Sequence, residues 1–311
     1  MNVMSPILAV TAPVFAMVAV GMALRRWKLI DDPFIQTASN LTFRVTMPVL
    51  FFLSLWRADI QHSLHPSLIL MFAAATLLGF AGSWAWAVRT LPPVSRGVFV
   101  QGSFRGNCGV LSFALAASYF GDYGSSVGGV LAGFTILIFN ILAVLVLSFY
   151  SPTLTFNIRQ VLKDLGTNPL VLSVLLGIAA SWYGLTLPVW ITKSAEYLAN
   201  LTLPLALICV GATLSVLAVK ESGRAALQAS LIKIGLLPVG GCTLAWLFGF
   251  EGRDLLLLWM FLASPTAAGS FSMAMGAGSD ARLAANIIAM STFISLFSVT
   301  GGLMVLRALG H

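Results

Sequence analysis

The sequence contains few charged residues. Only 9% of its 311 residues are Asp, Glu, Lys or Arg, and 59% are hydrophobic, whereas soluble domains carry about 25% charged residues. Apolar runs of about 20 residues, long enough to span a bilayer, recur along the whole chain. This composition argues against a soluble protein and predicts an integral membrane protein whose surroundings are the lipid bilayer.

Histidine and cysteine are also scarce, and neither is arranged for chemistry. The three histidines lie outside the apolar runs: His62, His65 and His311. No Ser–His pair or histidine-based metal site is therefore available within those runs. The three cysteines lie in separate apolar segments without CxxC or metal-ligand spacing, and are expected to be small core residues: Cys108, Cys209 and Cys242. The sequence predicts no enzyme activity, no metal site and no cofactor.

Acidic residues are missing from the middle of the apolar runs. All ten Asp and Glu fall in predicted loops or near predicted helix ends, with Glu196 the nearest to mid-span. Proton- and sodium-coupled carriers commonly use buried carboxylates, so this absence argues against such coupling. Carbonyls and hydroxyls at a helix break could still bind Na⁺, which leaves coupling to Na⁺ or H⁺ open. The pair Asp31-Asp32 precedes a proline and predicts a helix start rather than a metal site.

Ten apolar segments qualify as predicted membrane spans. They cover about residues 5–25, 34–56, 67–89, 96–120, 125–149, 167–184, 190–217, 225–249, 253–277 and 282–307. The longest predicted loop, 151–166, lies between the fifth and sixth spans. A basic cluster, Arg25, Arg26 and Lys28, follows the first span rather than preceding it, so this span is expected to be retained and not cleaved as a signal peptide.

Basic residues in the loops predict the orientation. Ten lie in the loops that follow the odd-numbered spans: Arg25, Arg26, Lys28, Arg89, Arg96, Arg159, Lys163, Lys220, Arg224 and Arg282. Four lie on the opposite side: Arg57, Lys193, Arg253 and Arg307. Cytoplasmic loops carry the excess of Lys and Arg, so both termini are predicted to lie outside. The net charge of +7 is scattered, not gathered into a stripe, and predicts no nucleic-acid partner.

The second half of the chain echoes the first. The letters TMPV at 46–49 recur as TLPL at 202–205, and SFALA at 112–116 recurs loosely as SFSMA at 270–274. Five predicted spans lie on each side of the central loop, so the two repeats, 1–150 and 167–311, should have opposite orientations across a cytoplasmic loop, 151–166. Inverted repeats are typical of secondary transporters, whose broken helices meet near the bilayer midplane around the substrate.

Helix breakers lie at matching depth in the fourth and ninth spans. Gly102, Gly106 and Gly109 surround Asn107 in the fourth span and weaken the helix there. Pro265 interrupts the ninth span and lies 158 residues after Asn107. The two breaks are predicted to cross, and the N–H groups freed at each break favour an anion.

Arg105, beside the first break, is the strongest candidate for binding. A mid-membrane arginine must face the protein interior or a cavity, and its fork of donors suits a carboxylate. The alternatives are a structural role on buried carbonyls and snorkelling. Asn107 and Thr266 are expected to hydrogen-bond the substrate beside Pro265. Further predicted contacts are Ser264, Ser270 and Thr46. Residues predicted to shape the crossing are Gly106, Gly109, Gly269, Pro48 and Pro204.

Other polar residues within the spans have simpler interpretations. Arg44 could line the same cavity, but snorkelling is favoured. Lys233 lies two turns from the cytoplasmic end of the eighth span, where it is also expected to snorkel. Thr46 and Thr202 precede the paired prolines, so their hydroxyls could equally satisfy freed carbonyls.

Several segments together resemble the auxin efflux carrier family, specifically its compact bacterial permease members. They are FRGNCG (104–109), LPLALICVGATL (203–214), ASPTAAGSFSMAMGAG (263–278), MSTFISLFSV (290–299) and VTMPVLFF (45–52). The resemblance runs from end to end and implies an all-α membrane fold of ten helices in a five-plus-five inverted repeat. It implies a dimer-forming scaffold of helices 1, 2, 6 and 7 and a transport domain of helices 3–5 and 8–10. Asn107 and Pro265 match the family's crossover residues.

The resemblance implies a small organic acid, such as malate or malonate, as the substrate. The chain departs from plant members in its short central loop, in the absence of a proline at the first break and in the absence of an acidic–basic pair in helix 3. We expect a homodimeric carrier of the bacterial inner membrane that works by alternating access. The alternatives are a Na⁺- or H⁺-coupled symporter or antiporter of another solute, and a membrane channel or sensor.

Overall fold

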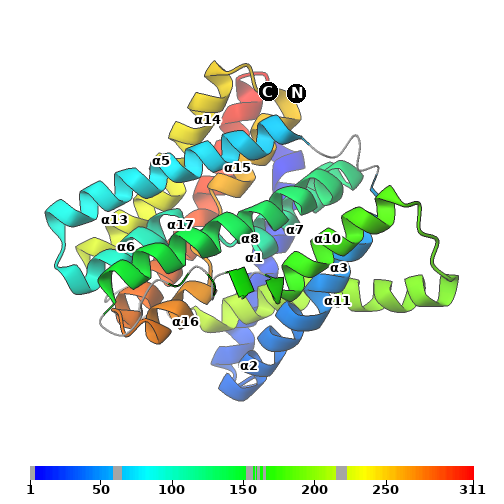
Figure 1. The fold of residues 1–311 in the computed structure, drawn as a ribbon, viewed down its shortest axis with the longest axis horizontal. Coiled ribbons are helices and arrows are strands. Elements are labelled where there is room, and N and C mark those ends of the chain that lie inside the picture. The colour runs from blue at the N-terminus through cyan, green and yellow to red at the C-terminus, as the bar shows by residue number, and fades with distance from the viewer. Residues whose placement is uncertain are drawn as a thin grey trace.

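The computed structural model describes residues 4–58, 65–151, 166–214 and 223–311, and residues 157, 159, 162 and 163 between them. Within these ranges the chain is helical (Figure 1). Most of the predicted central loop 151–166 lies outside the described residues. The same holds for residues 215–217 at the predicted end of the seventh span.

Seven helical segments in the described ranges are long and apolar enough to cross a membrane. They are α1 (Met4–Arg26), α2–η1–α3 (Asp32–Leu41, Thr42–Thr46, Met47–Trp56), α5 (Pro66–Thr90), α8 (Asp122–Tyr150), α11 (Val189–Thr213), α13–η3–α14 (Arg224–Leu231, Ile232–Leu236, Leu237–Leu247) and α17 (Ala281–Ala308). A shorter apolar helix, α10 (Pro169–Trp182), lies at the predicted sixth span. A multi-pass, all-helical membrane protein is thus confirmed, whereas the count of ten crossings stays a prediction.

The predicted fourth and ninth spans are each divided into shorter helices. The fourth consists of α6 (Pro93–Phe104), η2 (Cys108–Ser112) and α7 (Phe113–Phe120), and the ninth of α15 (Gly252–Leu262) and α16 (Gly269–Gly276). Helix α6 ends at Phe104, and the backbone of the next residue, Arg105, is extended. Helix α15 ends shortly before Pro265, as the missing N–H of proline requires. Both predicted breaks are confirmed.

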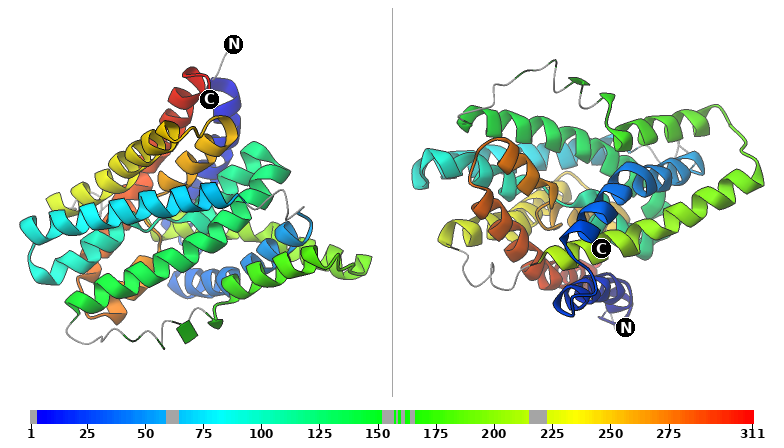
Figure 2. Two further views of the ribbon diagram at one scale, coloured as in Figure 1. Left: turned by 45° about the horizontal axis from the view of Figure 1, so that its top comes forward. Right: turned by 90° about the horizontal axis from the view of Figure 1, so that it is seen from below.

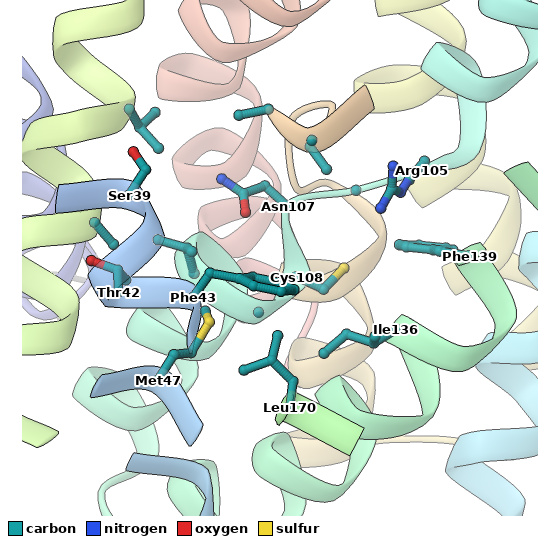
Figure 3. A pocket seen from close by; sticks show the side chains of 18 of the residues that line it. Ser39, Thr42, Phe43, Met47, Arg105, Asn107, Cys108, Ile136, Phe139 and Leu170 are labelled. Atoms are coloured by element: carbon teal, nitrogen blue, oxygen red, sulfur yellow. The ribbon is translucent and has the colours of Figure 1, made fainter. Parts of the chain in front are cut away.

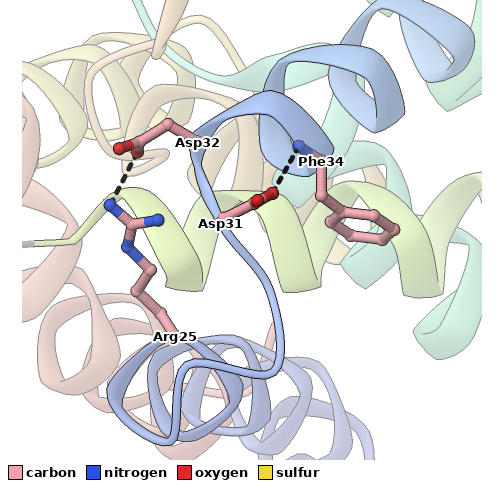
Figure 4. Close-up of polar contacts among 4 residues, drawn as sticks. All are labelled: Arg25, Asp31, Asp32 and Phe34. Carbon is pink, nitrogen blue, oxygen red and sulfur yellow. Dashed lines mark hydrogen bonds and ion pairs between the residues drawn. The ribbon is translucent and has the colours of Figure 1, made fainter.

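The acidic pair at the start of α2 acts as a helix cap. The Asp31 carboxylate accepts the N–H of Phe34 at 2.9 Å, and Pro33 follows in the first turn. Asp32 pairs with Arg25 at 2.7 Å across the turn from α1 (Figure 4). The interpretation of this pair as a helix start is confirmed, because a side-chain acceptor satisfies one of the orphan N–H groups of the first turn.

The helices pack in two groups. In the first group, α3 lies against α10 and α11, and α1 lies against α11. Gly21 and Gly211 allow the backbones of α1 and α11 to touch, since a Cβ at either would strike a carbonyl of the other helix. In the second group, α6 lies against α5, α8, α13 and α17. Figure 1 shows α3, α10 and α11 on the right and α5, α6 and α13 on the left.

The start of α1 and the end of α17 lie near each other, and the two helices pack together (Figure 2). Both termini therefore lie on one side of the molecule. Which side of a membrane this is stays a prediction.

Candidate functional site

The two broken helices meet through their own backbones. Gly106 and Thr266 form an isolated antiparallel bridge. The N–H of Asn107 donates to the Pro265 carbonyl at 2.7 Å, and the N–H of Ala267 donates to the Arg105 carbonyl at 3.1 Å. Backbone groups freed by each break thus find partners in the other break, as buried polar groups must. We call the two segments, residues 105–107 and 265–267, the crossing.

Side-chain hydroxyls satisfy further backbone groups around the crossing. Thr266 donates its hydroxyl to the carbonyl of Gly102 at 2.7 Å, near the end of α6. The N–H of Thr266 donates in turn to the hydroxyl of Ser291 in α17 at 3.0 Å. Ser112 donates to the carbonyl of Met260 in α15 at 2.9 Å. Each of these bonds ties one broken helix to another element and removes an orphan group from an apolar interior.

Lys233 caps the end of α15. Its side chain is fully buried, and Nζ donates to the carbonyl of Leu262 at 2.6 Å. The expectation that Lys233 snorkels to the cytoplasmic end is wrong. The residue lies in the π-helical turn η3, and its ammonium reaches the carbonyl end of a half-helix, where the helix dipole favours a cation. It lies beneath Gly106, whose Cβ position is 3.3 Å from Nζ.

A cavity of about 460 Å³ lies beside the crossing, and Figure 3 shows Asn107 between Arg105 on one side and Ser39 and Thr42 on the other. This volume falls in the range of small-ligand sites, about 300–1,000 Å³. Polar side chains that line it are Ser39, Thr42, Arg105, Asn107, Thr135, Asn140, Asn168 and Thr213. Its apolar lining includes Phe43, Met47, Ile136, Phe139 and Leu170. The cavity therefore offers both a polar and an apolar surface.

Arg105 is the one charged side chain among the described residues that line this cavity. Nη2 donates to Oδ1 of Asn140 in α8 at 3.0 Å, and Nη1 contacts Sδ of Met273 in α16 at 2.6 Å. None of the ion pairs found among the described residues includes Arg105. A guanidinium has five N–H donors, so these two contacts leave donors available for a ligand.

The predicted site residues separate into two sets. Those that line the cavity are Arg105, Gly106, Asn107, Gly109 and Gly269. Those that are buried and lie outside its lining are Thr46, Ser264, Pro265, Thr266 and Ser270. The hydroxyls of Thr46, Ser264 and Ser270 have no hydrogen-bond partner among the described residues. Substrate contact by this second set stays a prediction.

The paired prolines and Arg44 are not among the residues that line the cavity. Pro48 lies in the first turn of α3, and Pro204 lies within α11. Thr202 directs its hydroxyl to the Leu198 carbonyl at 3.5 Å, which agrees with a structural role. Arg44 is exposed and does not line the cavity, and its snorkelling stays a prediction.

Asn140 and Met273 were not predicted from the sequence. Asn140 is the one polar residue in the apolar run ILIFNILAV (136–144), and a lone amide at such a position could have been noticed. Met273 gave no signal, because methionine is a common residue in apolar helices. The three cysteines are buried and free, as expected, and two of them, Cys108 and Cys209, line the cavity.

Comparison with known proteins shows the family of this chain. A profile described as membrane transport protein matches residues 6–159 and 151–302. An uncharacterized transporter of Methanocaldococcus jannaschii is 24% identical over 299 residues, covering 92% of this chain and 94% of that protein. An uncharacterized transporter of Methanothermobacter thermautotrophicus is 25% identical over 291 residues, with the same two shares of 92% and 94%. The chain belongs to the membrane transport protein family, and its resemblance to the auxin efflux carriers is confirmed.

Proposed function

We propose that this membrane transporter carries a small organic acid, and that Arg105 and Asn107 bind the carboxylate of the substrate at the crossing. The observation that supports this proposal is the charge of the cavity. Arg105 is the one charged side chain among the described lining residues, and its described partners are the neutral side chains of Asn140 and Met273. A guanidinium within a membrane protein needs an anion or dipoles around it, and a carboxylate accepts two of its donors at once.

The other residues that line the cavity suggest the chemical nature of the part of the substrate beyond its carboxylate. Phe43, Ile136 and Phe139 form part of an apolar surface, while Ser39 and Thr42 offer hydroxyls. A molecule with one carboxylate at Arg105, a short carbon body against the apolar surface, and a hydroxyl or second carboxyl facing the hydroxyls matches this lining. In this proposal Thr266 supports the site through its bond to Gly102, and Ser264, Ser270 and Thr46 are further contacts during transport.

Alternating access is proposed from the packing of the helices. The first group, α1, α2–η1–α3, α10 and α11, corresponds to the scaffold, and the remaining helices correspond to the transport domain. The cavity is lined by Asn168 at the start of α10 and Thr213 at the end of α11. Both lie next to loops on the basic, and hence proposed cytoplasmic, side. On the proposed outer side, the rings of Phe51 and Phe113 pack edge to face with centroids 5.1 Å apart, which closes part of the seam between the two groups.

The proposal has three further parts. The chain forms ten membrane-spanning helices in two inverted repeats. It forms a homodimer through the scaffold, and it lies in the bacterial inner membrane. The division of the profile match between residues 6–159 and 151–302 is compatible with two halves. The crossing itself supports equivalent breaks, because Asn107 and Pro265, 158 residues apart, are joined by a backbone hydrogen bond.

Counterflow in proteoliposomes tests the proposal. Vesicles are preloaded with malate, malonate, succinate or an indole carboxylate, and uptake of the labelled acid is measured. The wild type is expected to accumulate at least one acid, Arg105→Ala is expected to accumulate none, and Arg105→Lys is expected to bind more weakly, because a point charge replaces a two-pronged donor. Arg44→Ala is the matched control, since Arg44 is exposed and does not line the cavity.

Two outcomes would contradict the proposal. One is a folded protein without counterflow for any acid. The other is an Arg105→Ala variant that transports like the wild type. A channel would instead pass current without counterflow.

Asn140→Asp provides a second, nearly isosteric test. The new carboxylate would take the place of Oδ1, which accepts from Arg105 at 3.0 Å, and would compete with the substrate for the guanidinium. Hydrogen bonds to charged groups contribute about 1.5–3 kcal/mol, so the apparent affinity for the acid should fall by roughly tenfold or more. Asn140→Ala, which adds no charge, should change affinity much less. If Asn140→Asp and the wild type bind the acid with equal affinity, Arg105 does not bind the carboxylate of the substrate.

A further inference from the structure

Lys233 is a buried ammonium without a carboxylate partner among the described residues. Its side chain is fully buried, and it takes part in none of the ion pairs found in the described ranges. A charged side chain at such depth is costly and marks a functional position by default. Its one described hydrogen bond goes to the Leu262 carbonyl at 2.6 Å. The carbonyl end of α15 is therefore what stabilises this charge.

The ammonium shares one feature with a coupling cation, because its partner is the carbonyl at the end of a half-helix. In carriers with broken membrane helices, coupling cations are coordinated by unwound carbonyls and by the C-terminal ends of half-helices. Leu262 is the last residue of the half-helix α15, and its carbonyl is such a ligand. Nζ also lies against the crossing, 3.3 Å from the Cβ position of Gly106. Gly106 lines the cavity, so the ammonium lies against a residue that borders the space proposed for the substrate.

At the other break, no cation among the described residues donates to the carbonyl end of α6. The carbonyl of Gly102, near the end of α6, accepts from the neutral hydroxyl of Thr266. Under the offset of 158 residues, the position equivalent to Lys233 in the first half is Ala75. Of the two carbonyl ends at the crossing, only that of α15 accepts a hydrogen bond from a charged side chain among the described residues, and this charge is covalently part of the chain.

We propose that the ammonium of Lys233 is the resident cation of the crossing, filling the place in which a coupling Na⁺ would otherwise bind, so that transport requires no monovalent metal ion. This proposal rests on the proposed function and adds that transport of the acid is not coupled to Na⁺ or another monovalent metal ion. The ammonium holds the carbonyl end of α15 against the crossing, and so positions Gly106 and Asn107 beside Arg105.

Thermal unfolding of the purified protein tests the proposal without any substrate. Wild type, Lys233→Ala and Lys233→Met are compared in chloride salts of Na⁺, K⁺, methylammonium and choline at one ionic strength. The wild type should unfold at the same temperature in all four. Lys233→Ala leaves space beside the Leu262 carbonyl, so Na⁺ or methylammonium should raise its unfolding temperature by about 2 °C or more over choline. Lys193→Ala, which removes an exposed lysine, should behave like the wild type.

Counterflow of the acid that the wild type transports gives the second readout. Wild-type flux should be equal in Na⁺ and choline, and Lys233→Ala should transport only when Na⁺ or methylammonium is added. Lys233→Met, which fills the space without a charge, should fold but lose transport in every salt. Na⁺-dependent wild-type flux, a salt-insensitive Lys233→Ala, or full activity of Lys233→Met would each overturn the proposal. If no acid shows counterflow, the proposed function fails, while the unfolding measurement still decides the role of Lys233.

Discussion

The two helix breaks are joined to each other through their backbones, but different residues produce them. Helix α6 ends among glycines, and the carbonyl of Gly102 receives the neutral hydroxyl of Thr266. Helix α15 ends before Pro265, and the carbonyl of Leu262 receives the ammonium of Lys233. The similarity between the two halves therefore extends to the positions at which the helices break. The similarity does not extend to the side chains that satisfy the freed carbonyl groups at each break, as an apolar interior requires.

The cations show the same difference between the halves. Arg105 belongs to the first break and lines the cavity, whereas Lys233 comes from the second half and lies behind the crossing. The positions related to them by 158 residues are Ala263 and Ala75, neither of which carries a charge. Each half therefore contributes one cation to the region of the crossing, and the two do not occupy equivalent positions. An asymmetric site can bind an asymmetric molecule such as a hydroxy acid in one orientation.

The largest effect is expected where the glycine break meets the lysine. A Cβ at Gly106 would lie 3.1 Å from Sγ of Cys108 and 3.3 Å from Nζ of Lys233. Gly106→Val should therefore displace the ammonium from the Leu262 carbonyl and destabilise the protein by about 3 kcal/mol, the upper part of the usual range for overpacking. Thermal unfolding of the purified variant measures the loss.

Gly109→Ala is the control for this substitution, because it changes a second glycine of the same break. Its Cβ would meet only Cε of Met47, at 3.3 Å, and a methionine terminus moves easily. Gly109→Ala should retain nearly wild-type stability. If both variants are equally stable, the close contact between Gly106 and Lys233 is not important for the fold.

The sequence was enough to locate the breaks, because proline and clustered glycines act locally on the backbone. The Asp31 cap was predictable for the same reason, since its partner Phe34 is three residues away. Contacts made over long distances were not predictable. Lys233 lies 29 residues from Leu262, and it lies in a π-helical turn that changes the direction of side chains relative to a regular helix.

For Arg105, the sequence predicted the environment of the side chain but not its contact partners. Its depth in the fourth span predicted that it faces the interior or a cavity, because a buried guanidinium has few other options. Its partners, Asn140 and Met273, are 35 and 168 residues away, and nothing in the local pattern pairs them with Arg105. Similarly, Thr266 was predicted from its place beside the break, but the direction of its hydroxyl toward Gly102 depends on how the two helices cross.

Thr266→Val should have an intermediate effect. The substitution keeps the shape of the side chain but removes the hydroxyl that donates to Gly102 at 2.7 Å. The buried carbonyl would lose this partner, at a cost of about 1–3 kcal/mol. Thr266→Ser, which retains the hydroxyl, should be closer to the wild type. The unfolding temperatures of the two variants measure the contribution of this hydrogen bond. If Thr266→Val is as stable as Thr266→Ser, the hydrogen bond does not stabilise the end of α6.

Pro265→Ala should have the smallest effect, although proline is the most visible break in the sequence. The crossing is held by the bond from Asn107 to the carbonyl of residue 265 and by the bond from Ala267 to Arg105. Alanine retains both. The N–H of Thr266 already donates to Ser291 in α17 at 3.0 Å, so a continuous helix through this point would have to give up that bond and the backbone bridge. The expected loss is about 0.4–1 kcal/mol, mostly from the greater freedom of the unfolded chain.

The Pro265→Ala experiment combines thermal unfolding with counterflow of the transported acid. Near-normal values for both would show that contacts across the crossing, rather than the proline ring, keep α15 and α16 apart. A large loss of transport with normal stability would show that the proline ring keeps α15 and α16 apart. A continuous helix across residues 263–268 can be stable, but it would eliminate the crossing and with it the proposed binding site. In that case the proline break would depend on one residue, as the glycine break depends on Gly106, and the two halves would be more alike than their side-chain chemistry indicates.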